Sequence, residues 1–484
     1  MATQFYIETL GCQMNVLDSE LVAGLLVRAG YELAHCRRKA DVILLNTCSV
    51  RQHAEDKVYS ALGRLKDAKS RRPPKIIGVL GCMAQKDRER IFQRAPHVDL
   101  VVGPGQLDRL PELLQRVISG EGPQIEVSAR RTEGSRVSIQ QSFAPFAPPR
   151  AAETRTHRHQ AMVRIMFGCD KFCTYCIVPS VRGPEQSRPV EQIEAEVRCL
   201  TDQGCLEVTL LGQTVNSYQG TAAGRKVRLA DLLYRLHDVS GLRRLRFVTN
   251  YPRHMTDDLL AAVRDLPKVC PYLHVPAQSG SNRVLRRMKR GYTVEEYREM
   301  LARIRDMLPH AAVTSDFIVG FCGETEEDFQ QTADLVRWGR FKNSFIFKYS
   351  PRPGTKSADR YADDVPDELK RRRNHELLAL QNAISEEENR PLLGRTVEIL
   401  VEGPSKASRK QGAQGPQAAA APQLTGRTPC DRIVVFEGPA GLIGRIVPVE
   451  IYRTDAFTLF GRVKQATGSR QHAAGSTQQE VVSG

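Results

Sequence analysis

The chain has 484 residues, too many for one hydrophobic core, and this length predicts about two to four domains. Hydrophobic residues make up 41% and charged residues 26%, values that are typical of a folded globular protein and exclude large-scale disorder. The 70 basic and 55 acidic side chains leave a net charge of +15, which favours a polyanionic partner.

Cysteine content and hydropathy indicate the compartment. Twelve cysteines in 484 residues are too sparse for a small disulfide scaffold, so reduced thiols that hold a metal or a cluster fit better. The sequence has no apolar run of about 18 residues, and its start lacks a basic segment followed by an apolar block. We therefore expect a cytoplasmic protein.

The first 120 residues alternate apolar runs with helix-like segments. The runs are FYIETLG, DVILLNT, KIIGVLG and VDLVVG, and helices are expected at about Ser19–Ala29 and His53–Lys69. This alternation predicts βαβ units and a parallel sheet over residues 1–120. Residues 121–156 are rich in Pro, Gly, Arg and small side chains, which indicates a linker.

The same alternation resumes over residues 157–390. Strands are expected at MVRIMFG, LEVTLLG, RLRFVTN, YLHVPAQ, AVTSDFIVGF and SFIFKYS, a pattern that predicts a partial (β/α) barrel. A charged helix follows, in which the run Lys370–Arg373 is interpreted as a polar face. Residues 391–465 contain β-branched runs with Gly turns, which predict a small antiparallel β-barrel. A low-complexity loop is expected at about 406–423, and a disordered tail at 466–484.

Cys169, Cys173 and Cys176 stand in a C-x3-C-x2-C spacing directly after the strand-like run MVRIMFG. A structural zinc site needs four protein ligands and the usual iron–sulfur cluster needs four cysteines, so three thiolates leave one iron open for a substrate or cofactor. The alternatives are a zinc knuckle completed by His157 or His159, and three packed cysteines.

Cys12, Cys48 and Cys82 form a second, dispersed set in which each residue follows an apolar run. Their spacings of 36 and 34 residues match one βαβ repeat, so all three are expected at the carboxyl edge of the sheet, where such folds bind ligands. A single buried cysteine is more often structural, but three in matching positions favour a second cluster. The remaining cysteines show no ligand-like spacing and are expected to be structural; they are Cys36, Cys199, Cys205, Cys270, Cys322 and Cys430.

Motifs along the whole chain resemble the methylthiotransferase family of radical S-adenosylmethionine (SAM) enzymes. ETLGCQMNVLDSE, NTCSVR and GVLGCMAQ resemble its amino-terminal cluster domain, and GCDKFCTYCIVP, LLGQTVNSY, HVPAQSGS and DFIVGFCGET resemble its radical SAM core. LTGRT and the strands after it resemble the TRAM domain, a small RNA-binding barrel. The SVR after NTC, the QMN after Cys12 and the NSY of LLGQTVNSY are similar to the branch of the family that modifies tRNA.

This resemblance implies an α/β cluster domain at 1–120, a radical SAM partial barrel at 157–390 and a TRAM barrel at 391–465. It implies that Cys12, Cys48 and Cys82 hold an auxiliary 4Fe-4S cluster, and that Cys169, Cys173 and Cys176 hold a 4Fe-4S cluster exchangeable with SAM. The implied reaction is methylthiolation at C2 of N6-isopentenyl(dimethylallyl)adenosine at position 37 of tRNA, with SAM as both radical source and methyl donor. The implied partners are tRNA, an electron donor and sulfur supply proteins, and the chain is expected to be a monomer without membrane contact.

Two groups of alternatives stay open at this point. Threonylcarbamoyladenosine in tRNA or a ribosomal protein would be modified by the same chemistry, and a zinc-stabilised RNA-binding protein would have no catalysis. The chain also departs from the family pattern where Cys322 replaces proline in GFCGET, and where VPSVRG stands for a sequence like VPYTRG. Neither departure changes one of the six expected cluster ligands.

Beyond the clusters no catalytic side chain is predicted. Polar residues at the expected strand ends of the core are candidates for the SAM and substrate pocket, by the rule that such sites lie at the carboxyl edge. They are Gln213, Asn250, Gln278, Ser279, Asp316 and Glu324. Candidates for RNA contact are Arg182, Arg188 and Arg352 in the core, and Thr425, Arg427 and Phe436 in the terminal barrel.

Overall fold

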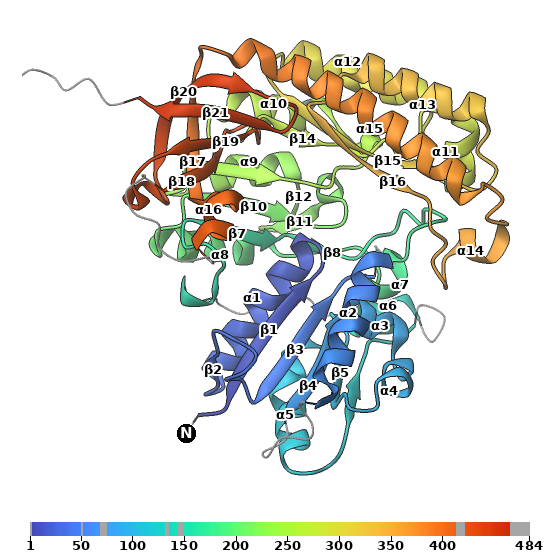
Figure 1. Cartoon of the computed structure of the whole chain (residues 1–484), viewed down its shortest axis with the longest axis vertical. Helices are drawn as coiled ribbons and strands as arrows, with labels where there is room; N and C mark the ends of the chain where they lie inside the picture. The colour runs from blue at the N-terminus through green and yellow to red at the C-terminus, as the bar shows by residue number, and fades with distance from the viewer. Residues whose placement is uncertain are drawn as a thin grey trace, which may run out of the picture. The chain divides into compact units, whose positions relative to one another are not determined.

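The computed structural model describes residues 2–49, 52–67, 75–130, 135–143, 150, 152–412 and 422–464 (Figure 1). The chain divides into two compact units. The first comprises Met1–Arg390 with two short returns, Pro429–Arg432 and Asp455–Phe457, and the second comprises the other residues after 390. Across the described ranges, no helix combines the length and apolar character needed to span a bilayer.

The first unit begins with a parallel sheet, which has six strands within the described residues. Its order is β2-β1-β3-β4-β5-β6 and every neighbouring pair is parallel. The strands are β1 (Gln4–Leu10), β2 (Glu32–Leu33), β3 (Val42–Thr47), β4 (Ile76–Gly81), β5 (Leu100–Val102) and β6 (Gln124–Glu126). The predicted parallel sheet is confirmed. The edge strand β6 falls inside the segment expected to be a linker, because its backbone pairs with β5 although its composition is loop-like.

Helices cover both faces of this sheet (Figure 1). Its helices are α1 (Gln13–Arg28), α2 (Gln52–Leu65), α3 (Cys82–Asp87), α4 (Arg90–Arg94) and α5 (Leu110–Ile118). Successive strand residues point to opposite faces, so Leu44 packs with α1 and α5 while Ile43 and Leu45 pack with α2, α3 and α4. Helix α1 begins six residues before the predicted start, because Cys12 forms its N-cap. Residues 68–74, which include the predicted end of the next helix, lie outside the described part.

Residues 157–390 contain two three-stranded parallel sheets, which together form the predicted partial barrel. Their orders are β13-β10-β7 and β14-β15-β16, and a bridge between Leu245 and Val269 links them. The strands are β7 (Gln160–Arg164), β10 (Glu207–Leu211), β13 (Arg244–Phe247), β14 (Tyr272–His274), β15 (Ala312–Val319) and β16 (Asn343–Lys348). All six runs predicted as strands are therefore strands, and their apolar side chains form one large core with the helices around them.

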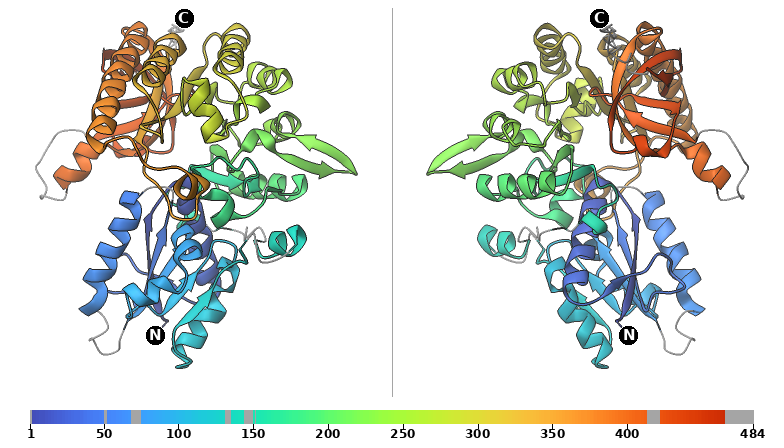
Figure 2. Two further views of the ribbon diagram at one scale, coloured as in Figure 1. Left: turned by 90° about the vertical axis from the view of Figure 1, so that its right-hand side faces the viewer. Right: turned by 90° about the vertical axis from the view of Figure 1, so that its left-hand side faces the viewer.

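The long helices of this region alternate with its strands. They are α8 (Val190–Asp202), α9 (Leu229–His237), α10 (Asp257–Asp265), α12 (Val294–Met307), α13 (Glu326–Gly339) and α15 (Asp367–Asn389). Shorter elements are α6 (Arg136–Gln141), α7 (Val178–Arg182), α11 (Asn282–Met288) and α14 (Lys356–Arg360), together with the strand pair β8 (Met166–Phe167) and β9 (Gln186–Ser187). The hairpin of β11 (Gln219–Ala222) and β12 (Arg225–Arg228) extends away from the core, as Figure 2 shows in green.

The second unit contains a closed barrel with the strand order β17-β18-β19-β21-β20 in its described part. The strands are β17 (Thr396–Pro404), β18 (Gln423–Arg427), β19 (Ile433–Glu437), β20 (Ile446–Thr454) and β21 (Thr458–Val463). The predicted small barrel is confirmed, with one difference: β19 and β21 pair in parallel. The predicted loop at 406–423 begins with α16 (Lys406–Gly412), while residues 413–421 and the predicted tail at 466–484 lie outside the described residues.

Candidate metal centres and active site

Cys12, Cys48 and Cys82 lie at the carboxyl ends of three neighbouring strands. In the register of the sheet Leu10 of β1 is opposite Thr47 of β3, and Thr47 is opposite Gly81 of β4. Cys48 and Cys82 come directly after their strands and Cys12 comes two residues after Leu10, so the sheet brings the three thiols to one edge. Cys48 and Cys82 are buried, whereas Cys12 is exposed.

Buried amides hold the Cys12 segment and the end of β3 together. Asn15 Nδ2 donates to Asn46 Oδ1 and to the carbonyl of Thr47, both at 3.1 Å, and Asn46 Nδ2 donates to the carbonyl of Asn15 at 2.9 Å. Asn15 Oδ1 accepts from the backbone N–H of Cys12 at 3.2 Å and from its thiol at 3.3 Å. Because both amides are fully buried, their hydrogen bonds fix the spacing of the cysteine-bearing loops.

The electrostatics of this edge favour thiolate ligands. A hydrogen bond from Cys48, with further help from the charge of Arg182, lowers the pKa of Cys12 to about 6. Burial raises the pKa of Cys82, and the charge of Arg182 works against that rise. A thiol that binds a metal is deprotonated, so one acidic thiol and a nearby buried cation suit a cluster whose thiolate ligands are negatively charged.

Arg182 belongs to α7 of the core but reaches into the cysteine edge of the N-terminal sheet. Its Nε donates to Cys82 Sγ at 3.3 Å and its Nη2 donates to Asp18 Oδ2 at 2.6 Å. Asp18 Oδ1 accepts a second charged hydrogen bond from Arg164 Nη1 at 2.9 Å. The side chains of Asp18, Arg164 and Arg182 are at most 2% exposed. The two α/β regions of the first unit therefore share one buried ionic cluster beside Cys82.

Cys169, Cys173 and Cys176 lie in the loop after β7 and β8, at the carboxyl end of the first core strand. The loop needs two left-handed residues, Gly168 at φ +75° and Phe172 at φ +51°. A Cβ on Gly168 would lie 2.0 Å from the carbonyl oxygen of Pro184, so only glycine fits there. The backbone N–H of Cys169 donates to the carbonyl of Gly183 at 3.1 Å, which closes the loop on itself.

This loop also has a buried arginine at one of its thiols. Arg290 Nη1 donates to Cys173 Sγ at 3.2 Å, and its other nitrogens bond Tyr292 and the carbonyl of Pro276. Burial, as the main cause, raises the pKa of Cys169 and of Cys176 to about 12. These thiols therefore stay protonated in the metal-free chain at neutral pH, and bound iron would have to displace their protons.

One short helix connects the two cysteine sets. Helix α7 begins two residues after Cys176 and ends at Arg182, which contacts Cys82. Ile177 and Val181 pack against Cys82 in one small apolar cluster. The two candidate centres are therefore joined by five residues of helix as well as by the ionic cluster around Asp18.

The zinc-knuckle alternative does not agree with the position of the histidines. The carbonyl of His159 accepts from the backbone of Leu206 and Glu207, at the amino end of β10 and next to the start of β7. Cys169 follows the carboxyl end of β7, so the length of the strand separates it from His159. Over the ranges that the structure describes, no three His, Cys, Asp or Glu side chains converge on a single metal ion. Thiolates on different irons of one cluster lie farther apart than the ligands of one ion.

Three of the predicted pocket residues have buried oxygens without a hydrogen-bond partner. They are Gln213 Oε1, Asn250 Oδ1 and Asp316 Oδ1, from segments at β10, β13 and β15. His274 connects two of them, because its carbonyl accepts from Asn250 Nδ2 at 3.1 Å and its Nε2 lies 3.4 Å from Asp316 Oδ2. Unpaired buried acceptors are costly, so this edge fits a ligand with several N–H and O–H donors, as SAM has.

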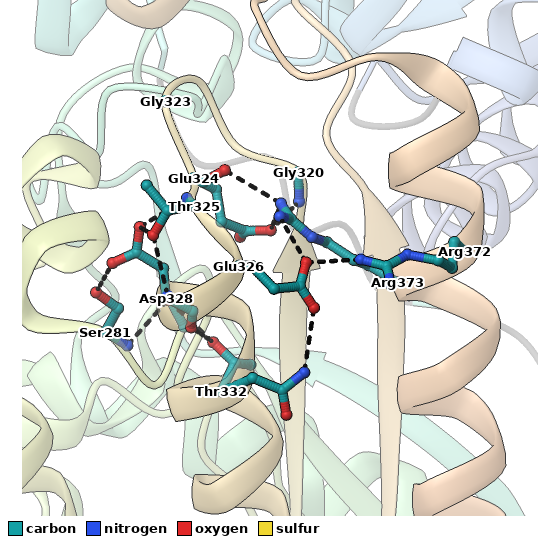
Figure 3. Close-up of polar contacts among 12 residues, drawn as sticks. Ser281, Gly320, Gly323, Glu324, Thr325, Glu326, Asp328, Thr332, Arg372 and Arg373 are labelled. Carbon is teal, nitrogen blue, oxygen red and sulfur yellow. Dashed lines mark hydrogen bonds and ion pairs between the residues drawn. The ribbon is translucent and has the colours of Figure 1, made fainter.

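The other three predicted pocket residues already have protein partners, and Figure 3 shows those of Glu324. Glu324 is 5% exposed and accepts from the backbone N–H of Gly320 at 2.7 Å and from Arg373 Nη1 at 2.9 Å. Ser279 Oγ lies 3.3 Å from Thr332 Oγ1, and the backbone N–H of Gln278 donates to the carbonyl of Asp316 at 2.8 Å. Burial raises the pKa of Glu324 to about 7.

The structure also corrects the interpretation of the run Lys370–Arg373 as a polar helix face. Lys370 and Arg373 of α15 are 3% and 2% exposed, so half of the run Lys370–Arg373 faces inward and only its other two residues form a polar face. Cys322 is likewise buried, in an apolar cluster with Phe321 and Tyr349. It fills the place of the family's proline as a packing residue.

The structure corrects most of the expected RNA contacts. Arg182, Arg188 and Arg352 are 2%, 4% and 7% exposed, so none of them presents its guanidinium to a bound phosphate. Arg188 instead bonds the carbonyl of Arg164 at 2.6 Å and Glu196 at 2.7 Å. Phe436 is 2% exposed in the barrel core and has no face free for a base.

Thr425 and Arg427, the other two expected RNA contacts, lie on β18 of the barrel. Both are partly exposed, and Arg427 pairs with Glu402 at 3.1 Å. The same barrel exposes a residue that the sequence did not single out. Tyr452 of β20 is 53% exposed, and the guanidinium of Arg462 lies 5.2 Å from its ring centroid.

A charged cavity lies beside the auxiliary cysteines. It has a volume of about 700 Å³ between α2, α3, α4 and α7, and its lining contains more basic than acidic side chains. The basic residues are Lys86, Arg88, Arg90, Arg94 and Arg130, and the acidic ones are Glu55, Asp87 and Glu89. This excess of positive charge agrees in sign with a polyanionic partner.

Several residues of the site were not predicted. Asn15, Asp18, Arg164 and Arg290 contact the cysteine loops or each other, although none has ligand-like spacing. Asp18 stands one residue before the predicted helix start, but in the structure it lies on the buried side of α1 near the core residues Leu17 and Leu21. A charge on a buried helix face predicts a buried partner but does not identify it.

Comparisons with known proteins agree with this arrangement. Residues 4–103 match the Uncharacterized protein family UPF0004, residues 163–336 the Radical SAM superfamily and residues 418–464 the TRAM domain. The tRNA-2-methylthio-N(6)-dimethylallyladenosine synthase of Rhodopirellula baltica is 56% identical over 464 residues, 96% of each chain. The synthase of the same name from Moorella thermoacetica is 45% identical over 95% of this chain and 98% of its own.

A solved structure supports the fold. The radical S-adenosylmethionine methyltransferase TsrM from Kitasatospora setae, with cobalamin and a 4Fe-4S cluster bound, superposes with a TM-score of 0.52 at 15% identity. The superposition covers 74% of this chain and 77% of that one. At this identity the likeness is one of fold alone.

The core barrel matches the Radical SAM superfamily and defines a radical SAM enzyme, and the three-cysteine edge of the first sheet is a candidate for a second centre. With relatives of this identity over nearly the whole length, the chain belongs to the tRNA-2-methylthio-N(6)-dimethylallyladenosine synthase family. It is a radical SAM methylthiotransferase whose cofactors are SAM and two 4Fe-4S clusters.

Proposed function

We propose that this chain methylthiolates C2 of N6-dimethylallyladenosine at position 37 of tRNA, and that each three-cysteine set holds one of its clusters. The main support is the arrangement of two separate sets of three thiols, each at the carboxyl edge of a parallel sheet and joined to the other through α7. Cys169, Cys173 and Cys176 would hold the cluster exchangeable with SAM, and Cys12, Cys48 and Cys82 the auxiliary cluster. When bound, the clusters and SAM supply the radical, the sulfur and the methyl group.

The protein's own residues bind and orient these groups. The unpaired oxygens of Gln213, Asn250 and Asp316 accept hydrogen bonds from the donor groups of SAM. Arg290 and Arg182 place one positive charge beside each cluster. The amides of Asn15 and Asn46 keep the auxiliary loops at a fixed spacing.

The tRNA is bound in this proposal by the basic surface and by the terminal barrel. The net charge of +15 and the basic cavity beside α3 attract phosphates, and Tyr452 offers an exposed ring on which a base stacks. The reaction consumes electrons and sulfur, so an electron donor and sulfur supply proteins are further partners. We place this chemistry in the cytoplasm, with the chain acting as a monomer.

Nucleoside mass spectrometry tests the substrate. In tRNA from a strain that lacks this chain, the methylthio form of N6-dimethylallyladenosine should be absent, and its unmodified precursor should accumulate. The wild-type gene should restore it, whereas Cys12→Ala and Cys169→Ala should not. If the strain instead lacks a methylthio form of threonylcarbamoyladenosine, that nucleoside is the substrate and the proposal is wrong. The proposal is also wrong if all methylthio nucleosides are present and a ribosomal protein is unmodified, because the ribosomal protein is then the substrate.

Anaerobic iron analysis tests the ligands. The purified protein should contain about eight irons, and Cys12→Ala and Cys169→Ala should each lower this to about four by removing different clusters. Cys322→Ala is the matched control, because this buried cysteine packs against Phe321 and Tyr349 and should leave the iron unchanged. If Cys12→Ala and Cys169→Ala remove the same cluster, the two-site assignment is wrong. Zinc near one per chain in colourless protein would favour the non-catalytic alternative.

A further inference from the structure

Arg182 is the one side chain of α7 that contacts a proposed ligand of the auxiliary cluster through a charged hydrogen bond. The arginine follows Cys176 by six residues, yet its Nε donates to Cys82 Sγ at 3.3 Å in the other α/β region. It is 2% exposed, so water does not screen its charge from the sulfur. The guanidinium therefore acts on the auxiliary site from the domain that binds SAM.

Asp18 is the carboxylate that pairs with Arg182, and it is shared. It lies 2.6 Å from Arg182 and 2.9 Å from Arg164, so one carboxylate accepts hydrogen bonds from two buried guanidinium groups beside Cys82. A carboxylate that is shared in this way offsets the charge of Arg182 only in part, which leaves this guanidinium able to interact with an anionic neighbour.

A donor of Arg182 also lacks a partner. Its Nη1 is buried and makes no hydrogen bond within the described structure. A buried guanidinium N–H without an acceptor is costly, and sulfur atoms of a cluster bound at Cys82 are acceptors in the right place. Hydrogen bonds to cluster sulfur and nearby positive charge are the features by which a protein raises the potential of an iron–sulfur cluster.

We propose that Arg182 is a positioning residue that sets the reduction potential of the auxiliary cluster, and that it does so from the radical SAM core. This inference rests on the proposed assignment of Cys12, Cys48 and Cys82 to that cluster. A positive charge stabilises the reduced cluster, which has one more negative charge than the oxidised form. Arg182 therefore keeps the auxiliary cluster easier to reduce than its thiolates alone would allow.

The chain contains a matched control in Arg290. This arginine is also buried, and its Nη1 donates to Cys173 Sγ at 3.2 Å, so it has the same relation to the other cluster. Removing one arginine should shift one potential and leave the other unchanged. A general loss of folding would affect both clusters.

The experiment is an anaerobic redox titration of the holoenzyme followed by electron paramagnetic resonance, with added SAM identifying the signal of the SAM-binding cluster. Arg182→Gln should shift the midpoint potential of the auxiliary cluster to a more negative value and leave that of the SAM-binding cluster unchanged. Arg290→Gln should do the reverse. An auxiliary potential that stays unchanged in Arg182→Gln overturns the proposal.

Arg182→Lys keeps the charge without the fork of donors, so its auxiliary potential should lie between those of the wild type and Arg182→Gln. If Arg182→Gln loses half of the iron and Arg182→Lys retains it, the potential of Arg182→Lys decides, and a value equal to that of the wild type overturns the proposal. If both lose the auxiliary cluster, Arg182 serves folding and the proposal is wrong. Because the potential is measured without tRNA, failure of the proposed substrate would leave this result standing.

Discussion

The carboxylate of Asp18 accepts a hydrogen bond from the guanidinium of Arg164 at 2.9 Å, and neither side chain is more than 1% exposed. The pair joins helix α1 of the first sheet to strand β7 of the barrel. A buried ion pair adds little net stability over an apolar contact, but breaking it leaves a buried charge without a partner. At Asp18 the effect is larger, because Arg182 depends on the same carboxylate.

We therefore expect Asp18→Asn to destabilise the protein by about 3–5 kcal/mol, with the two arginines left without a counter-charge. Thermal unfolding of the metal-free protein measures this. The control is Asp265→Asn, which removes an exposed partner of Arg264 and should leave the unfolding midpoint where it is. Equal midpoints for the two variants would show that the buried cluster does not hold the two regions together.

Gly81 gives a second prediction, on the backbone that positions Cys82. Its φ of +91° suits glycine, and a Cβ there would lie 2.4 Å from Asn46 Oδ1 and 2.8 Å from the carbonyl oxygen of Thr47. Gly81→Ala should therefore displace the Cys82 loop and lower the iron content toward four per chain.

Gly63 is the matched control for this change. It lies in helix α2 with ordinary φ, and its Cβ would meet nothing within 4 Å. Gly63→Ala should keep the iron and raise stability by about 0.5–1 kcal/mol, because alanine loses less backbone freedom in a helix. Iron content that is normal in Gly81→Ala would mean that the loop tolerates the shift.

The sequence predicted the strand ends well because their signals are local. Each of Cys12, Cys48 and Cys82 follows an apolar run, and parallel strands in sequence order place such positions along one edge. Cys169, Cys173 and Cys176 were identified by their C-x3-C-x2-C spacing, which is also a local signal. Neither prediction needed knowledge of a distant partner.

The partners of those cysteines could not be predicted in the same way. Arg182 was a candidate for RNA contact, but it is buried beside Cys82 through a contact with a residue 100 positions away in the chain. Phe436 was also a candidate for RNA contact, but the alternation of side chains along β19 places it in the barrel core. Such errors arise because the sequence shows the type of a side chain, whereas tertiary packing decides which face it is on.

Tyr452 leads to a prediction about tRNA binding. Its ring is 53% exposed on β20 beside Arg462, and stacking of a base on an aromatic ring contributes about 1–3 kcal/mol. Tyr452→Ala should thus weaken tRNA binding by roughly 5-fold to 150-fold at fixed salt. Fluorescence anisotropy with labelled tRNA measures the affinity. Tyr234→Ala, which removes a 45% exposed ring from helix α9, should leave the affinity for tRNA unchanged. If both variants lose the same affinity, the ring of Tyr452 does not bind tRNA specifically.

Glu324, in the segment after β15, leads to a prediction about pH (Figure 3). Burial outweighs the hydrogen bonds from Gly320 and Arg373 and raises the pKa of this carboxyl from the ordinary 4.5 to about 7. Between these two values the folded protein holds a proton that the unfolded chain has lost. The free energy of unfolding therefore falls as the pH rises through this window, by up to about 3 kcal/mol.

Glu324→Gln removes this dependence because an amide does not titrate in the same range. Thermal unfolding at pH 5 and at pH 7.5 should show a smaller loss of stability in the variant than in the wild type. The absolute unfolding midpoints of the two proteins also differ because the substitution weakens the hydrogen bond that Arg373 donates to residue 324. The comparison is therefore between slopes, and parallel slopes would show that Glu324 is ionised throughout the range and paired with Arg373 as an ordinary buried salt bridge.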